Sequence, residues 1–374
     1  MILASLVLAA LLAMAGAMAL PLVADLHRAA HVHLAFALGV MPLIMGAMTH
    51  FVPVLTRSRG AGRRIEALAL VAWLGGALIF AFLAFSLPVA VRGLAAALGL
   101  FAAIGLAAWQ YRRGRAALGG PHPGLRWYLA ALACLGASLL AVLAMTQWPQ
   151  HFLALKRLHL HLNLFGFVGL TAVGTLQVLL PTAAGRPDPG AAGRLRADLP
   201  AALAGTLLIA CGAAWLPFLS WPGLVLWLLP LGRMGLAWIE HYRGQVLAWH
   251  GAVPLLATAL AGFSLALLAG AAHGIGWVDA TGLAHAYVYA FLFPLVSGAA
   301  GQLLPLWLKP GRQTPWHELV RRRLTYASAP RALLLLAAGL LVLAGQRWGG
   351  ALAVAALLPV VLVAAWGFAQ SRRA

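Results

Sequence analysis

The sequence predicts an all-α, polytopic membrane protein of about 12 transmembrane helices, arranged as three pseudo-repeated four-helix units. Its composition is the first reason: 63% of the 374 residues are hydrophobic and 9% are charged, whereas a soluble protein carries roughly 25% charged residues. Apolar runs of about 20 residues, the length that crosses ~30 Å of hydrocarbon as a helix, recur along the chain. Lipid cannot pair with backbone polar groups, so these runs must be helical.

Twelve apolar runs follow one another, and each predicts one membrane helix. The first ends in Ala-Gly-Ala-Met-Ala, which is typical of a signal-peptide cleavage region. It lacks a basic start, however, and its apolar part is longer than the usual stretch of about 7–15 residues, so we expect a membrane helix there. The expected helices cover residues 2–20, 30–55, 66–86, 89–109, 126–147, 158–181, 198–218, 220–239, 247–270, 280–308, 328–345 and 349–370.

The basic residues predict the orientation of these helices. Most of the 26 lysines and arginines lie in loops after even-numbered helices or at the C-terminus. The loops after odd-numbered helices hold Arg28, Arg92, Lys156, Arg157 and Arg347. Positive loops stay in the cytoplasm, so both termini are expected there, in a bacterial-type cytoplasmic (inner) membrane. Since topology accounts for the net charge of +19, we expect the lipid bilayer and no nucleic acid as a partner.

A histidine, a glycine thirteen residues later and a proline twenty residues later occur three times. The copies are His33-Gly46-Pro53, His161-Gly174-Pro181 and His285-Gly298-Pro305. A further histidine, His31 or His159, precedes the first two copies by two residues. The spacing predicts a threefold internal repeat, with units of approximately 1–125, 126–246 and 247–374 in one integral membrane domain, 1–374.

Histidines inside membrane helices are costly and usually mark a functional site. Residues two apart on a helix project about 200° apart, so His31 and His33 cannot both reach one metal from a regular helix. The same holds for His159 and His161. Each pair therefore serves two separate sites, or one member is a ligand and the other a bystander.

Haem suits these surroundings better than a bare metal ion. The macrocycle is large and apolar and needs small residues, which the first two copies supply as glycines; close helix packing is the other role of such residues. Its propionates need cations at the water boundary, where Arg28, Arg157 and Arg347 are expected. Cys134 and Cys211 have neither zinc-site spacing nor the pattern of a covalently attached haem.

The stretches that carry the motif resemble a known family. They are HVHLAFALGVMPLIMGAMTHFVPVL (residues 31–55), HLHLNLFGFVGLTAVGTLQVLLP (159–181) and HAYVYAFLFPLVSGAAGQLLP (285–305). With the twelve helices, they resemble subunit I of the haem-copper oxidase superfamily. The same pattern is similar to that of the NnrS family, small membrane proteins described as binding haem and copper and linked to nitric oxide tolerance.

The resemblance implies particular ligands. Taken in order, His31 and His285 match the axial ligands of the low-spin haem, and His161 matches a copper ligand. His33 or His159 could take an axial role instead, because any copy of the repeat aligns with any other. Two departures stand out: helix seven lacks the family's adjacent histidine pair, and Leu283 stands where the tenth helix usually has a histidine.

These observations lead us to expect a haem-binding membrane protein with bis-histidine haem ligation near the periplasmic face, where the topology places all three histidine motifs, and with copper as a further metal that the resemblance implies. Electron transfer or a nitric-oxide-related role is the expected function, with quinol or cytochrome c as redox partner. One alternative is the catalytic subunit of a terminal oxidase or nitric oxide reductase with an atypical centre, so enzymatic activity stays open. Another is a permease with a histidine-lined path, although the expected helices place no acidic residue in mid-membrane.

Overall fold

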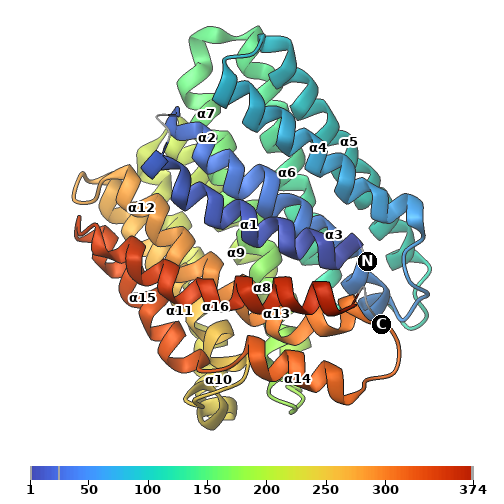
Figure 1. The fold of residues 1–374 in the computed structure, drawn as a ribbon. Coiled ribbons are helices and arrows are strands. Elements are labelled where there is room, and N and C mark those ends of the chain that lie inside the picture. The colour runs from blue at the N-terminus through green and yellow to red at the C-terminus, as the bar shows by residue number, and fades with distance from the viewer. Residues whose placement is uncertain (1, 24–25, 372–374) are drawn as a thin grey trace. The chain divides into compact units, whose positions relative to one another are not determined.

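A computed structural model describes residues 2–23 and 26–371, and every regular element within them is a helix (Figure 1). The expectation of an all-α protein is confirmed for this part of the chain. Its two ends, for which a cytoplasmic location is expected, include Met1 and residues 372–374, which lie outside the described residues.

The described chain forms two compact units. The first unit comprises Ile2–Gly174 and Leu195–Gly223, and the second comprises Thr175–Arg194 and the chain from Leu224 onward. Helices α8, α9 and α10 each pass from one unit into the other. The threefold repeat stays a prediction, although several local features recur at each copy of the motif.

The first unit is built mainly from the elements before α8. They are α1 (Ile2–Val23), α2 (Arg28–His33), η1 (Leu34–Val40), α3 (Met41–Thr56), α4 (Arg63–Phe85), α5 (Val89–Arg115), α6 (Gly124–Gln147), η2 (Pro149–His151), α7 (Phe152–His161) and η3 (Leu162–Leu170). Most of α9 (Ala191–Ala214) and η4 (Pro217–Leu219) also belong to it.

The second unit holds most of α8 and α10 and all later helices. These are α8 (Thr171–Ala183), α10 (Ser220–Val246), α11 (Val253–Gly274), α12 (Ala280–Ala286), η5 (Tyr287–Leu292), α13 (Phe293–Leu308), α14 (Pro315–Leu324), α15 (Ser328–Leu343) and α16 (Trp348–Ser371).

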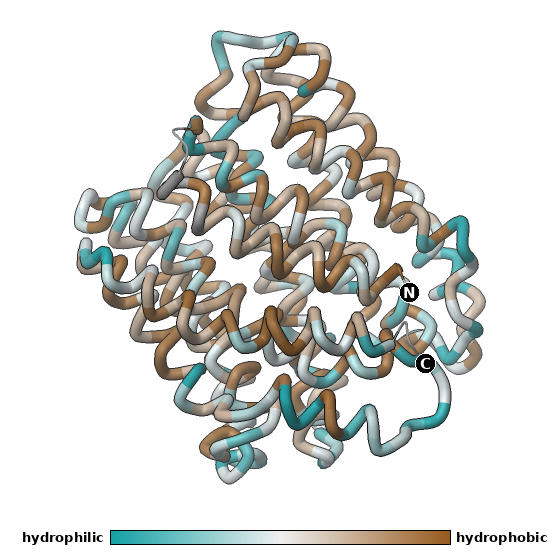
Figure 2. The backbone as a smooth tube through the Cα atoms, viewed as in Figure 1, coloured by the Kyte–Doolittle hydropathy of each residue, from teal (hydrophilic) through white to brown (hydrophobic). Residues whose placement is uncertain are grey.

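Eleven helical stretches of the described chain are long and apolar enough to cross a membrane. The chain is therefore a multi-pass membrane protein that contacts the lipid bilayer. The first expected span forms α1, whose apolar stretch Ile2–Met18 is shorter than the other eleven. Figure 2 shows the hydrophobic residues along the helices and the hydrophilic ones mainly at their ends and in the loops.

The stretch between the expected helices 280–308 and 328–345 contains the short helix α14. Its start is stabilised by a capping box, in which the backbone N–H of Thr314 donates to Nδ1 of His317 at 3.0 Å. Pro315 follows at the first helical position, where its missing N–H costs nothing. Ala327, with φ of 48°, then separates α14 from α15.

All three motif histidines lie in the last turn of an α-helix, immediately before a π-helical segment. His33 ends α2 before η1, His161 ends α7 before η3, and His285 lies in the last turn of α12 before η5. The π-helix is rare and occurs mostly as single turns, frequently at functional sites. A π-helical segment after each motif histidine is therefore a recurring structural feature of this chain.

The glycine thirteen residues after each motif histidine allows a neighbouring helix to approach closely. A Cβ atom on Gly46 would lie 2.7 Å from Cδ1 of Leu6, and one on Gly174 would lie 2.7 Å from Cβ of Trp127. On Gly298 it would lie 2.9 Å from Cδ2 of Leu256. The glycine of the motif thus serves close helix packing in all three copies.

The proline twenty residues after each motif histidine lies in the last turns of its helix. The carbonyl of Pro53 accepts from the N–H of Ser58 at 2.9 Å, and that of Pro305 accepts from Lys309 at 3.2 Å. The carbonyl of Pro181 accepts from Arg186 at 3.2 Å. Each proline therefore stands at a helix end, where its carbonyl binds the chain as it leaves the helix.

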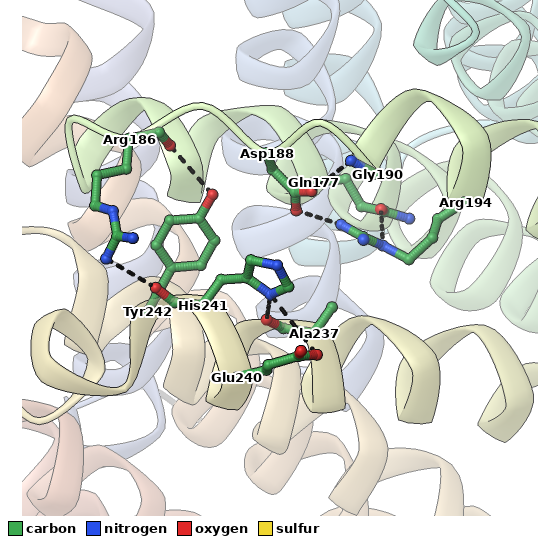
Figure 3. A network of polar contacts seen from close by, with 9 residues as sticks. All are labelled: Gln177, Arg186, Asp188, Gly190, Arg194, Ala237, Glu240, His241 and Tyr242. Carbon is green, nitrogen blue, oxygen red and sulfur yellow. Dashed lines mark hydrogen bonds and ion pairs between the residues drawn. The ribbon is translucent and has the colours of Figure 1, made fainter.

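A polar network in the second unit fastens the loop between α8 and α9 (Figure 3). The buried carboxylate of Asp188 pairs with Arg194, whose Nε donates to Oε1 of Gln177 at 3.2 Å. The hydroxyl of the buried Tyr242 donates to the carbonyl of Arg186 at 3.1 Å. These bonds tie the loop to α8 and to the end of α10.

Candidate haem site

Two histidines of the first unit lie close together: the motif histidine His33, and His159, which precedes the second copy of the motif. The rings of His33 and His159 are parallel to within 5°, and their centroids are 6.3 Å apart. His33 ends α2 and His159 lies in the last turn of α7, so residues far apart in sequence meet at the two helix-to-π transitions. The contact brings together a histidine from each of the first two copies of the H-x-H pair.

The spacing matches two imidazoles that bind opposite sides of one metal. Two metal–nitrogen bonds of about 2 Å, with each nitrogen about 1.1 Å from its ring centre, place the ring centres roughly 6 Å apart. The observed separation of 6.3 Å agrees with this value. Bis-histidine ligation of a haem iron requires this separation together with both Nε2 lone pairs, which lie in the ring planes, directed at the metal.

The hydrogen bond of His33 leaves its outer nitrogen available. Nδ1 of His33 lies 2.7 Å from the carbonyl oxygen of Ala29, one turn earlier on the same helix. A carbonyl only accepts, so Nδ1 carries the proton and Nε2 keeps its lone pair. Metal-binding histidines usually donate their second ring N–H to such a group, which also fixes the ring orientation.

His159 is held in the same tautomer by α6 and by η3. Its Nδ1 lies 2.9 Å from Oγ of Ser138 and 3.2 Å from the carbonyl oxygen of Ser138. The side-chain amide of Asn163 donates to the same Oγ and, at 2.8 Å, to the carbonyl of His159. Two donors therefore converge on Ser138, and Nε2 of His159 remains free to bind a metal.

The other members of the two H-x-H pairs have different surroundings. Nδ1 of His161 lies 2.8 Å from the carbonyl oxygen of Arg157, and its ring is tilted against Phe165 at 6.0 Å. Nδ1 of His31 is shielded from solvent and has no hydrogen-bond partner among the described residues. The two histidines of each H-x-H pair thus have different neighbours, as the helical period predicts.

His285 lies in the second unit, on α12. Its ring is stacked on Tyr289 of η5, with centroids 5.6 Å apart and an angle of 18° between the planes. His285 is exposed, whereas Tyr289 is buried. The expected pairing of His285 with His31 stays a prediction.

The cations expected to bind propionates lie at the start of a helix, within a helix and in a loop. Arg28 begins α2, and the exposed Arg157 lies on α7. Arg347 is exposed in the second unit, between α15 and α16. Lys156 is a further exposed cation on α7, three residues before His159.

No three histidine, cysteine, aspartate or glutamate side chains gather as a metal site within the described residues. The copper ligand role of His161 therefore stays a prediction. A haem needs only the two axial imidazoles from the protein, because its porphyrin supplies the other four nitrogen ligands.

Sequence reasoning missed three polar residues. Asn163 lies two residues after the motif histidine His161, so its place in the sequence could have pointed to the site. Ser138 reaches His159 from another helix, and nothing in the sequence near it points to this contact. Asp198 was expected at the start of a span, yet it lies inside α9 and its residue is completely buried. The chain therefore does carry a buried acid within an apolar helix, which weakens one argument against a permease.

A comparison with protein-family models finds no match to the chain, and a comparison with curated proteins finds none either.

Proposed function

We propose that the chain is a haem-binding protein of a bacterial-type cytoplasmic membrane, in which His33 and His159 are the axial ligands of a low-spin haem. The observation that carries the proposal is the parallel, 6.3 Å arrangement of the two imidazoles. The Nδ1 contacts with Ala29 and Ser138 support it, because they leave both Nε2 atoms free to bind iron. A haem held by two imidazoles supplies reversible one-electron chemistry.

Electron transfer is the role that this arrangement favours. If both histidines hold the group, protein side chains would occupy the positions that oxygen or nitric oxide needs, and the haem would supply one-electron transfer. Ser138 and Ala29 orient the two rings, and Lys156, three residues before His159, supplies a positive charge. A quinol or cytochrome c would be the redox partner, and a nitric-oxide-related role would use the same electrons.

The test is haem content and spectrum of histidine variants purified from haem-replete cells. We expect His33→Ala and His159→Ala each to lose the low-spin signal in reduced-minus-oxidised spectra, and pyridine haemochrome to show fewer haems per chain. His161→Ala is the matched control, two residues from His159, and should keep the signal. A wild-type protein without haem, or low-spin bands that survive in both first variants, would falsify the assignment.

The alternative pairing makes a different prediction for the same assay. If His31 and His285 are the axial ligands, His31→Ala and His285→Ala lose the low-spin signal, while His33→Ala and His50→Ala keep it. Oxygen and nitric oxide consumption then separate a haem-holding protein from a catalytic subunit, because only the latter consumes the gas when fully loaded. A protein that carries no haem but transports a solute would instead be a permease.

A further inference from the structure

An apolar groove of about 630 Å³ lies in the first unit, between α5, α6 and α7. Its walls are made of small and aliphatic side chains, among them Val89 and Gly93 of α5, Ala137 and Ala141 of α6, and Leu155 and Leu158 of α7. At one end, the lining changes to Thr146, Gln147 and Trp148, where α6 stops and the chain turns. The groove is thus apolar along its length and polar at the end of the helix.

The length of the groove corresponds to one leaflet of a bilayer. It follows α6 from Ala137 to Thr146, which is about 14 Å at the helical rise of 1.5 Å per residue. Half of a hydrocarbon core of ~30 Å is about 15 Å. A groove that starts at a helix end and runs inward by this length fits one acyl chain of a lipid.

Arg92 makes the polar end of the groove attractive to an anion. One of its terminal nitrogens donates to Oγ1 of Thr146 at 2.7 Å. Its Nε is shielded from solvent and has no hydrogen-bond partner among the described residues. Because a guanidinium has five N–H donors, it retains donors for a phosphate oxygen.

Nothing in the neighbouring sequence neutralises this arginine. No aspartate or glutamate occurs between Glu66 and Asp188, so α5, α6 and α7 carry no carboxylate at all. The middle of α7 instead adds two exposed cations, Lys156 and Arg157, which lie in sequence between the lining residues Leu155 and Leu158. The bases around the groove complement a negatively charged headgroup.

We propose that this groove binds an acidic phospholipid, with one acyl chain along α6 and the phosphate at Arg92. The site does not depend on haem, and it explains why an arginine is kept beside an otherwise apolar surface. A zwitterionic lipid satisfies the apolar groove but not the positive charge, so the site should discriminate by headgroup. The phosphate of a zwitterionic lipid can also accept from Arg92, but its choline cation is repelled by the bases around the groove. The net charge of the acidic lipid therefore sets the preference, and a difference of about 1.4 kcal/mol corresponds to about tenfold in affinity.

The test measures lipid binding to the full chain in mild detergent by native mass spectrometry. Phosphatidylglycerol and phosphatidylcholine with identical acyl chains are the probes, and inorganic phosphate is added in a third arm. Wild-type protein is expected to bind phosphatidylglycerol about tenfold more tightly than phosphatidylcholine. Arg92→Gln should abolish this preference, whereas Arg312→Gln, which removes an exposed base of the second unit, should not.

A second variant blocks the groove without touching the headgroup contact. A side chain on Gly93 meets nothing within 4 Å of its Cβ, so Gly93→Phe can enter the groove without a backbone clash. It is expected to weaken the binding of both lipids, whereas Gly270→Phe, at an equally open glycine of α11, leaves both unchanged. Equal affinity of the wild type for the two lipids, an unchanged preference in Arg92→Gln, or displacement by inorganic phosphate alone would overturn the proposal.

Discussion

Ser138 is the residue through which α6 acts on the proposed haem ligand. Its Oγ receives the amide of Asn163 and lies 2.9 Å from Nδ1 of His159. A hydrogen bond from Nδ1–H makes an imidazole more basic at its other nitrogen, and a more basic ligand favours ferric iron. The contact would therefore lower the reduction potential of the proposed haem.

Replacing Ser138 should consequently raise the midpoint potential. A neutral hydrogen bond contributes about 0.5–1.5 kcal/mol, which corresponds to a one-electron shift on the order of 20–60 mV. We expect Ser138→Ala to raise the potential by this amount in a spectroelectrochemical titration while the haem content stays unchanged. Ser138→Thr retains the hydroxyl and is the control. A potential that is the same in all three proteins would show that Ser138 does not tune the site.

His122 lies outside the membrane-spanning helices and should make the stability of the protein depend on pH. Its backbone N–H donates to the carbonyl of Leu55 at 2.8 Å, and its Nδ1 accepts from the N–H of Gly124 at 3.2 Å. Burial, and to a lesser extent the charge of Arg196, lower the pKa of His122 from 6.5. Nδ1 can accept this bond only while the ring is neutral.

The sign of the pH effect follows from this lowered pKa. Below pH 6.5 the unfolded chain binds a proton that folded His122 resists, so stability is present above 6.5 and is lost as the pH falls through the lowered pKa. We expect the apparent Tm in detergent to fall as the pH drops below 6.5. His122→Asn should flatten this dependence, because its side-chain oxygen can accept from Gly124 without titrating. An identical pH profile for both proteins would contradict the role given to His122.

At the scale of elements, two of the π-helical segments pack directly against a glycine of a neighbouring helix. A Cβ on Gly76 of α4 would lie 2.1 Å from the carbonyl oxygen of Ala37 in η1. A Cβ on Gly262 of α11 would lie 1.8 Å from that of Ala290 in η5. In both units the backbone of a π segment is thus in direct contact with a glycine of the neighbouring helix.

Filling the close contact at Gly174 should destabilise the first unit. A Cβ there would lie 2.7 Å from Cβ of Trp127, a fully buried residue whose indole N–H donates to the carbonyl of Leu195 at 2.8 Å. Since neither Trp127 nor the backbone can move easily, we expect Gly174→Val to cost about 1–3 kcal/mol. The measurement is the midpoint of denaturant-induced unfolding in detergent. Gly93→Val, at an open position, should shift it little; an equal shift in both would refute the packing argument.

Sequence patterns predicted these elements unevenly. The histidine, glycine and proline offsets marked the helices that carry the site, because each offset reflects a local requirement of one helix. The π segments were not predicted, since hydrophobic runs do not distinguish a π turn from an α turn. The pairing of His33 with His159 was one of several open alternatives, because which helices face one another depends on tertiary packing and on residues such as Ser138.

At the scale of the whole molecule, composition was sufficient to predict the class of protein. A chain with 9% charged residues must place most of its helices in lipid, and the structure shows eleven candidate spans near the expected places. The two compact units were not expected, because a unit boundary that cuts through α8, α9 and α10 leaves no change in composition. Contacts between helices, rather than any property of a single run, define such units.

The distribution of basic residues leads to a prediction for the topology of the whole chain. Arg57, Arg59, Arg63 and Arg64 surround the loop at Gly60, whereas the turn at Gln150 lies at the opposite end of α6 from the basic loop at Arg112–Arg115. Because positive loops stay in the cytoplasm, Gly60 should face inward and Gln150 outward. Both residues are exposed, so a cysteine at either place can be reached by a maleimide.

The experiment labels intact cells with a membrane-impermeant maleimide. Gln150→Cys should be labelled before lysis and Gly60→Cys only after it, while the parent chain gives the background from Cys134 and Cys211. Cys134 is buried and should contribute little. Labelling of Gly60→Cys in intact cells would reverse the orientation, and would move the proposed haem ligands His33 and His159 to the cytoplasmic side. The labelling pattern therefore decides from which side of the membrane electrons would reach the proposed site.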